Sequence, residues 1–211
     1  MQVSEQAQVP PLSLREMTHA PTVSAAALRD ALLALAPRPN FGVTLALAGV
    51  VARSWTAHGP QYLPLYGLDA QTTRDVLESH FPGCSGALTN AWAALTEAPV
   101  FADAIELDDL VTLLIDHRMV TDDDSRWLAH AIATACLGED HLWQDMNLPS
   151  RGVLSELLHG FFTSLAARNR QDMKWKKFLY LQLCERSEIR VCKSPSCGVC
   201  TDYSACFGSE V

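Results

Sequence analysis

The sequence predicts an all-α fold, in which a single helical domain ends in an irregular cysteine-rich metal-binding loop. Apolar residues recur at helical spacing in one segment after another, and alternating Val/Ile/Thr strands are absent. Proline- and glycine-containing turns separate these segments. The 211 residues, 48% of them hydrophobic, suffice for one domain with a large core.

The chain begins with a segment that has no helical period. Residues 1–22 contain three prolines among small and polar residues, so we expect a flexible lead-in. Residues 23–187 should then form the helical body. We expect its helices at Ser24–Ala36, Val43–Ala57, Ala70–Phe81, Leu88–Glu97, Ile105–Met119, Asp124–Leu137, Val153–Arg168 and Asp172–Arg186.

Turn-forming sequences define most of these boundaries. The first three helices should stop at Pro37–Asn40, His58–Pro60 and Pro82–Gly83. The acidic run Thr121–Asp124 offers carboxylates that can cap a helix start, and Leu148–Ser150 precedes the seventh helix. Each break is chemically ordinary, so the functional signal has to be sought elsewhere.

The last predicted helix, Asp172–Arg186, presents an apolar stripe. Trp175, Leu179 and Leu183 recur every four residues with Phe178 beside them, so this face should dock on the body. We therefore expect Lys174, Lys176 and Lys177 largely to face water or a partner. The remaining residues, 188–211, form the predicted cysteine-rich tail.

Charge is distributed unevenly along the chain. Residues 1–167 contain 8 Lys+Arg and 19 Asp+Glu, whereas residues 168–211 contain 8 and 5. Positive charge beside the cysteines can steer an anion or an acidic protein toward this end, although a basic solvent-exposed helix face would look the same.

Several function classes are disfavoured. The chain has no phosphate-binding Gly-x-x-x-x-Gly-Lys-Ser/Thr loop, no Gly-x-Gly-x-x-Gly fingerprint and no nucleophile in a recognisable setting, so we expect no enzyme. The longest apolar run, Phe41–Ala52, is too short to span a bilayer, and no secretory signal begins the chain. We expect a cytoplasmic protein with neither membrane nor nucleic acid among its partners.

The most informative motif is a C-x4-C-x2-C-x5-C run formed by Cys192, Cys197, Cys200 and Cys206. Four thiolates this close together repel one another and oxidise readily unless a soft metal holds them. The spacing favours an iron–sulfur cluster, with structural zinc and a redox disulfide as alternatives. Structural zinc usually uses two cysteine pairs, whereas only Cys197 and Cys200 form a C-x2-C pair here.

Two further residues are candidate accessory ligands. His141 lies in an inter-helix segment, where it could bind metal or serve a capping or structural role. Cys184 ends the last helix, and we interpret it, with Cys84 and Cys136, more simply as a core residue.

The carboxyl-terminal part resembles the NifQ family of nitrogen fixation. The resemblance extends over roughly residues 129–211 and is looser upstream. It rests on four stretches, His141–Asp145, Asp172–Phe178, Leu183–Glu185 and Cys192–Gly208.

The resemblance implies a specific function. Proteins of this family hold an iron–sulfur cluster that takes up molybdenum, a Mo–Fe–S species, and pass the metal into assembly of the nitrogenase iron–molybdenum cofactor. The implied partners are the NifEN scaffold complex and the nitrogenase iron protein, with molybdate as the metal source. The implied cluster ligands are Cys192, Cys197, Cys200 and Cys206. A zinc-stabilised helical interaction module remains the alternative.

Overall fold

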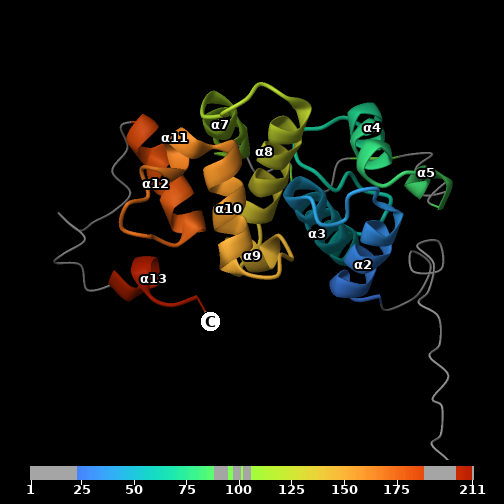
Figure 1. Cartoon of the computed structure of the whole chain (residues 1–211), viewed down its shortest axis with the longest axis horizontal. Coiled ribbons are helices and arrows are strands. Elements are labelled where there is room, and N and C mark those ends of the chain that lie inside the picture. Colours follow the sequence, from blue (N-terminus) through green and yellow to red (C-terminus); the bar gives the residue numbers. More distant parts are fainter. Residues whose placement is uncertain (1–22, 88–94, 97–100, 102–105, 188–202, 211) are drawn as a thin grey trace, which may run out of the picture.

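The computed structural model describes residues 23–87, 95–96, 101, 106–187 and 203–210. Helices make up most of this part (Figure 1). The helices are α2 (Ala25–Leu35), α3 (Gly42–His58), α4 (Ala70–His80), α5 (Cys84–Ala87), α7 (Glu106–Asp116), α8 (Asp123–Cys136), α9 (Leu142–Asp145), α10 (Arg151–Phe161), α11 (Thr163–Ala166), α12 (Trp175–Arg186) and α13 (Tyr203–Phe207). The predicted all-α class is confirmed for these residues, where the strand-like contact is an isolated bridge between Tyr62 and Thr96.

Side-chain caps begin four of the described helices, one of them as expected from the sequence. Asp122 accepts a hydrogen bond from the backbone N–H of Ser125 and thereby caps α8, as the acidic run predicted. Ser24, Asp69 and Ser150 cap α2, α4 and α10 in the same way. Most long helices therefore begin and end within two residues of their predicted bounds, the usual uncertainty of such boundaries.

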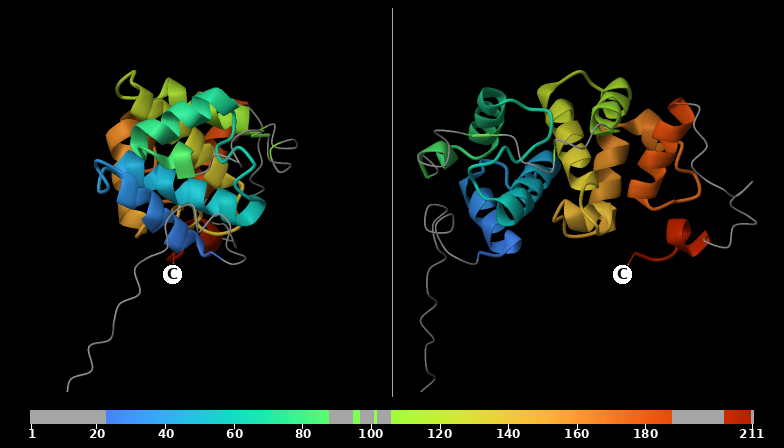
Figure 2. Two further views of the ribbon diagram at one scale, coloured as in Figure 1. Left: turned by 90° about the vertical axis from the view of Figure 1, so that its right-hand side faces the viewer. Right: turned by 180° about the vertical axis from the view of Figure 1, so that it is seen from behind.

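The core is built around α3, which is buried on most of its circumference. It packs against α2, α8, α9 and α10, and α7 packs between α8 and α12. Gly49 permits one especially close approach, because a Cβ atom at this position would overlap the carbonyl oxygen of Met146. The helices α2–α5 lie at one end of the molecule and α11–α13 at the other (Figures 1 and 2).

Four predicted helices differ from the structure, one of them only because α7 ends at Asp116 and not at Met119. The segment predicted as Val153–Arg168 breaks at Phe162, which is fully buried, and the preceding carbonyl of Phe161 accepts from the backbone of Met119. The last long helix begins at Trp175, since Asp172 has φ of +55°, outside the right-handed helical region. Thr96, inside the predicted helix Leu88–Glu97, bridges to Tyr62 instead, and most of that segment lies outside the described residues.

The tail was predicted to be irregular, and this is wrong for its last part. Tyr203–Phe207 form α13, so Cys206 lies on a helical turn. The lead-in, residues 1–22, and residues 188–202 lie outside the described part of the chain. Within the described part, no helix is both long and apolar enough to cross a bilayer.

Candidate functional site

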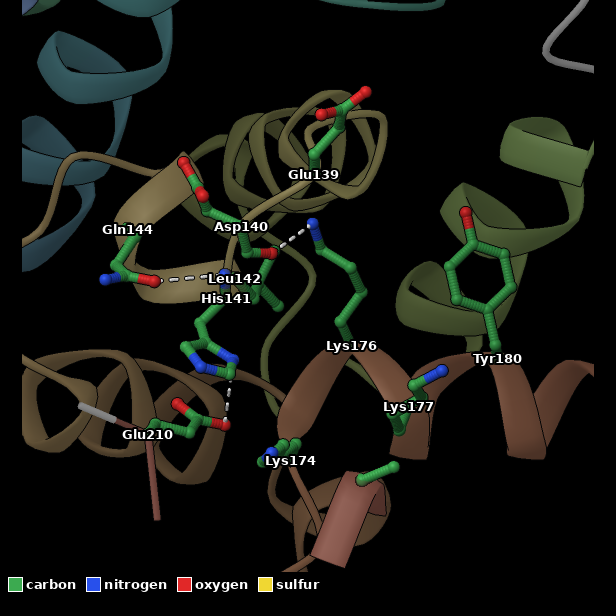
Figure 3. A pocket seen from close by; sticks show the side chains of 11 residues that line it. Glu139, Asp140, His141, Leu142, Gln144, Lys174, Lys176, Lys177, Tyr180 and Glu210 are labelled. Atoms are coloured by element: carbon green, nitrogen blue, oxygen red, sulfur yellow. Dashed lines mark hydrogen bonds and ion pairs between the residues drawn. The ribbon is translucent and has the colours of Figure 1, made fainter. Parts of the chain in front are cut away.

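The apolar stripe of α12 docks on the body as predicted. Trp175, Phe178, Leu179 and Leu183 are all buried, with exposed fractions of 8% or less. The opposite side of the first turn faces the α8–α9 loop, and α13 lies below it (Figure 3). This orientation places the three predicted lysines, Lys174, Lys176 and Lys177, around a common pocket.

Lys176 does not face water, which corrects the expectation for this residue. Its ammonium group donates to the carbonyl oxygens of Gly138 (2.9 Å) and Asp140 (2.8 Å), and to the carboxylate of Asp145. The Asp145 side chain is only 2% exposed and also accepts from Arg53 at 2.8 Å. Lys176 is therefore a structural link between α12 and the α8–α9 loop.

Gly138 leaves the space that this buried ion pair needs. A Cβ atom at this position would overlap the carboxylate of Asp145. Arg53 further bridges the pair to Asp140, whose carboxylate lies 3.2 Å from the guanidinium group. The ion pairs of Asp145 with Lys176 and Arg53, together with the two hydrogen bonds from Lys176 to loop carbonyls, hold the loop that carries His141 against α12 and α3.

His141 occupies the N-cap position of α9, in line with its structural interpretation. Its backbone N–H donates to the side chain of Gln144 at 3.1 Å. The imidazole instead points toward the end of the chain, where its Nδ1 lies 4.0 Å from a carboxylate oxygen of Glu210 (Figure 3). The Glu210 side chain is 5% exposed and also lies 3.5 Å from Nε of Arg151.

Lys174 attaches the segment containing Cys206 to the body. Its backbone N–H donates to the carbonyl of Cys206 at 2.8 Å, and its ammonium group donates to the carbonyl of Ser204 at 3.3 Å. Cys206 is partly buried and packs against the core. Glu210 adds a second attachment four residues later, so α13 is held on both sides.

A pocket of about 560 Å³ lies between these elements. Its lining comes from the α8–α9 loop, the first turns of α12 and the carboxyl-terminal segment (Figure 3). The lining residues are Glu139, Asp140, His141, Leu142, Gln144, Lys174, Lys176, Lys177, Tyr180, Ala205 and Glu210. Burial, with smaller effects of nearby groups, raises the pKa of Tyr180 to about 12, so its hydroxyl is a neutral donor at physiological pH.

Of the other predicted ligands, only Cys184 lies in the part of the chain that the structure describes, and it is not brought to this pocket. Cys192, Cys197 and Cys200 lie outside the described residues. Cys184 lies near the far end of α12, roughly 15 Å along the helix axis from Lys174 at 1.5 Å per residue. Among the residues that the structure describes, no three His, Cys, Asp or Glu side chains are grouped so that they could hold a metal.

Cys84 and Cys136 are buried, as predicted for core thiols. Burial is the largest cause that raises the pKa of each to about 12. A thiol with such a pKa stays protonated at neutral pH, and protonated thiols are poor metal ligands. These two residues therefore do not compete with the cysteine cluster.

Sequence reasoning missed several residues of this region. Asp145 lies in one of the stretches that resemble NifQ, which could have identified it, whereas nothing in the local sequence marks Glu210, Arg151 or Tyr180. Their roles follow from contacts between distant segments, such as the 31 positions between Asp145 and Lys176.

Comparison with known proteins confirms the resemblance. A NifQ family model matches residues 46–208. The NifQ protein of Azotobacter vinelandii is 39% identical over 161 residues, which cover 72% of this chain and 83% of the relative. The NifQ protein of Rhodobacter capsulatus is 37% identical over 124 residues, covering 52% and 69%. The NifQ homologue of Sinorhizobium fredii is 36% identical over 143 residues, covering 68% and 60%.

No solved structure matches the chain. The region matched by the family model contains the α8–α9 loop, α12 and all four clustered cysteines, and it extends over well more than half of the chain. The chain therefore belongs to the NifQ family of nitrogen-fixation proteins.

Proposed function

We propose that this protein carries a Mo–Fe–S cluster and donates its molybdenum for assembly of the nitrogenase iron–molybdenum cofactor. Cys192, Cys197, Cys200 and Cys206 are the proposed cluster ligands. The cluster is the cargo of the protein, which acts as a carrier and not as an enzyme. Donation would take place in the cytoplasm, to the NifEN scaffold complex acting with the nitrogenase iron protein.

The proposal is supported first by the chemistry of the donor set. Molybdate is a hard, oxygen-bound dianion, whereas the cofactor needs molybdenum bound by sulfur. Thiolate and sulfide are soft ligands that suit iron–sulfur species and sulfur-bound molybdenum. Because four cysteines lie within a stretch of 15 residues, one centre can use all of them without help from the rest of the fold.

One structural observation carries the proposal furthest. Cys206 is held against the body beside the pocket that contains three lysines, through the hydrogen bond from the backbone of Lys174. A thiol ligand fixed next to cationic side chains suits a protein that receives metal as an anion and keeps it on sulfur. A purely structural zinc site has no need of such a neighbouring pocket.

Metal and sulfide analysis of anaerobically purified protein, with electron paramagnetic resonance on the same sample, tests the proposal. We expect iron, acid-labile sulfide and molybdenum together, and their loss in Cys197→Ala and Cys206→Ser. Cys184→Ser is the matched control and should retain the cluster, since Cys184 lies near the far end of α12.

Two other outcomes would overturn the carrier function or the ligand assignment. Stoichiometric zinc without iron, in protein from cells supplied with iron and molybdenum, would overturn the carrier function and favour the zinc-stabilised interaction module. Retention of full iron and molybdenum in all four single cysteine variants would overturn the ligand assignment.

A further inference from the structure

Lysine is used in an unusual way along this chain. The sequence contains twelve arginines but four lysines, and three of these four, Lys174, Lys176 and Lys177, line the same pocket. The fourth, Lys193, lies outside the described residues. Compact ammonium groups are thus concentrated around one cavity, where they can act as point charges toward a small anion.

Several charges of the pocket lining are already engaged within the protein. Lys176 is paired with Asp145, and the carboxylate of Asp140 is paired with Arg53. The side chains of Glu139 and Asp140 point away from the lysines in Figure 3. Lys177 is exposed, and Lys174 donates to a neutral carbonyl at 3.3 Å. Among the described residues, Lys174 and Lys177 thus make no ion pair with a carboxylate and stay available to an added anion.

Glu210 supplies the anion that this region holds in the present structure. Its carboxylate is nearly buried, yet the two nearest basic side chains among the described residues lie at 3.5 Å (Nε of Arg151) and 4.0 Å (Nδ1 of His141). Both distances exceed the 2.7–2.9 Å typical of charge-assisted hydrogen bonds. Nε of Arg151 is buried and has no hydrogen-bond partner among the described residues. The donors around Glu210 are thus incompletely satisfied.

We propose that this pocket binds a tetrahedral oxyanion, with Lys174, Lys177 and His141 as its donors and with the carboxylate of Glu210 as an internal competitor. The inference rests on the proposed function, for which it identifies molybdate as the relevant member of this chemical class and locates its binding site. The pocket volume of about 560 Å³ leaves ample room for a four-oxygen anion. Tyr180 adds a neutral hydroxyl donor to the same lining.

The pocket lies next to one of the proposed cluster ligands. Ala205, next to Cys206, forms part of the wall, so a bound oxyanion would lie beside one of the proposed thiolate ligands. The oxyanion is held there by nitrogen donors, which suit its hard oxygens, before it reaches sulfur. Binding of the oxyanion and binding of the cluster therefore use different side chains and can be separated by mutation.

Titration calorimetry of the reduced, metal-free, full-length protein with sodium molybdate tests this inference, with sodium sulfate as a second titrant. Lys177→Gln should weaken molybdate binding about tenfold, the usual effect of losing a hydrogen bond to a charged group. Glu210→Gln should strengthen binding, by about threefold or more for a like charge removed at about 6 Å. Arg170→Gln removes an exposed charge outside the pocket lining and should change the affinity little.

The second titrant distinguishes the possible anions. Equal affinities for sulfate and molybdate, both weakened by Lys177→Gln, identify a general site for tetrahedral oxyanions, whereas selective molybdate binding identifies a site adapted to the metal. The inference is overturned if neither anion binds, or if the affinity is insensitive to Lys177→Gln and Glu210→Gln. It is also overturned if Cys197→Ala abolishes the binding, because the anion would then be held by thiolates.

Cluster analysis on the same variants separates this inference from the proposed function. Lys177→Gln should retain normal iron and acid-labile sulfide while acquiring less molybdenum from molybdate. A wild-type protein without iron would disprove the carrier function, whatever the calorimetry gives. Normal molybdenum uptake by an iron-loaded Lys177→Gln protein would disprove the oxyanion site alone.

Discussion

Lys176 donates to the buried carboxylate of Asp145, 31 positions earlier in the chain, and so joins α12 to the loop between α8 and α9. The same ammonium group also binds two carbonyl oxygens of that loop. One lysine thereby fixes the separation of two walls of the pocket.

Lys176→Met should destabilise the protein markedly. Removing one partner of a buried ion pair costs about 3–5 kcal/mol, and Arg53 remains to compensate part of the charge on Asp145, so we expect about 2–4 kcal/mol. Urea unfolding measures this loss. Lys177→Met is the matched control, since the exposed side chain should contribute no more than about 0.5 kcal/mol. Equal losses in the two variants would show that the contact with Asp145 contributes nothing.

Two glycines in helices should respond to alanine in opposite directions. Gly49→Ala introduces a Cβ atom that overlaps the backbone carbonyl of Met146, so α3 and the end of α9 must separate at a cost of roughly 1–3 kcal/mol. Gly160, in α10, has open space around the corresponding position. Alanine there should stabilise the helix by about 0.5–1 kcal/mol. The melting temperatures of both variants measure these changes. A loss at Gly49 alone would show that close helix packing, and not a general intolerance of helical glycines to alanine, lowers the stability.

Cys84 and Cys136 should be chemically silent in the folded protein. Burial raises the pKa of both thiols to about 12, so very little thiolate is present at pH 8. Mass-spectrometric mapping after brief iodoacetamide treatment should find these two residues unmodified, and unfolding in guanidinium chloride should make them reactive. Rapid native labelling of Cys136 would mean that the core beneath the Asp145–Lys176 pair opens readily.

Stability should decline as the pH falls below about 6.5. Burial, as the largest cause, lowers the pKa of His80 and of His130 in the folded protein, so the neutral rings are favoured there. Below the ordinary histidine pKa of about 6.5 the unfolded chain binds protons that the folded chain does not, which favours unfolding. The stabilisation that comes from keeping both rings neutral is present in full above about pH 6.5. It is lost as the pH falls through the lowered pKa values that the two histidines have in the folded protein.

Urea midpoints at pH 7.5 and pH 5.5 measure this effect. The Asp and Glu residues whose pKa is lowered, such as Asp122, act at more acidic pH and do not interfere. His130→Asn should reduce the decline, although the lost hydrogen bond from the ring to the carbonyl of Tyr66 will lower stability at both pH values. A decline of the same size in this variant would exclude His130 as a source.

The helices could largely be predicted from the sequence because local signals determine them. Apolar spacing identified the buried stripe of α12, and the acidic run before α8 identified its cap. The break at Phe162 was not predictable in this way. It depends on the carbonyl of Phe161 accepting a hydrogen bond from Met119, a residue of the α7–α8 loop far away in the sequence.

In the candidate site, too, the features set by local sequence could be predicted, and those set by contacts between distant segments could not. The motif identified four cysteines as cluster ligands, and this assignment stays a prediction for all four of them. The environment of each lysine, in contrast, is a tertiary property. Lys176 and Lys177 are adjacent on one helix, yet one is paired with a buried carboxylate and the other is exposed, because only one of them points toward Asp145.

The scarcity of lysine also makes the pocket unusually accessible to spectroscopy. Reductive methylation with ¹³C-formaldehyde labels amines, and in this chain three of the four side-chain amines line the pocket. The resulting methyl signals would form a nearly background-free NMR probe of one region in a 23.1 kDa protein. Changes at the pocket during metal delivery could thus be followed in solution without assigning the rest of the spectrum.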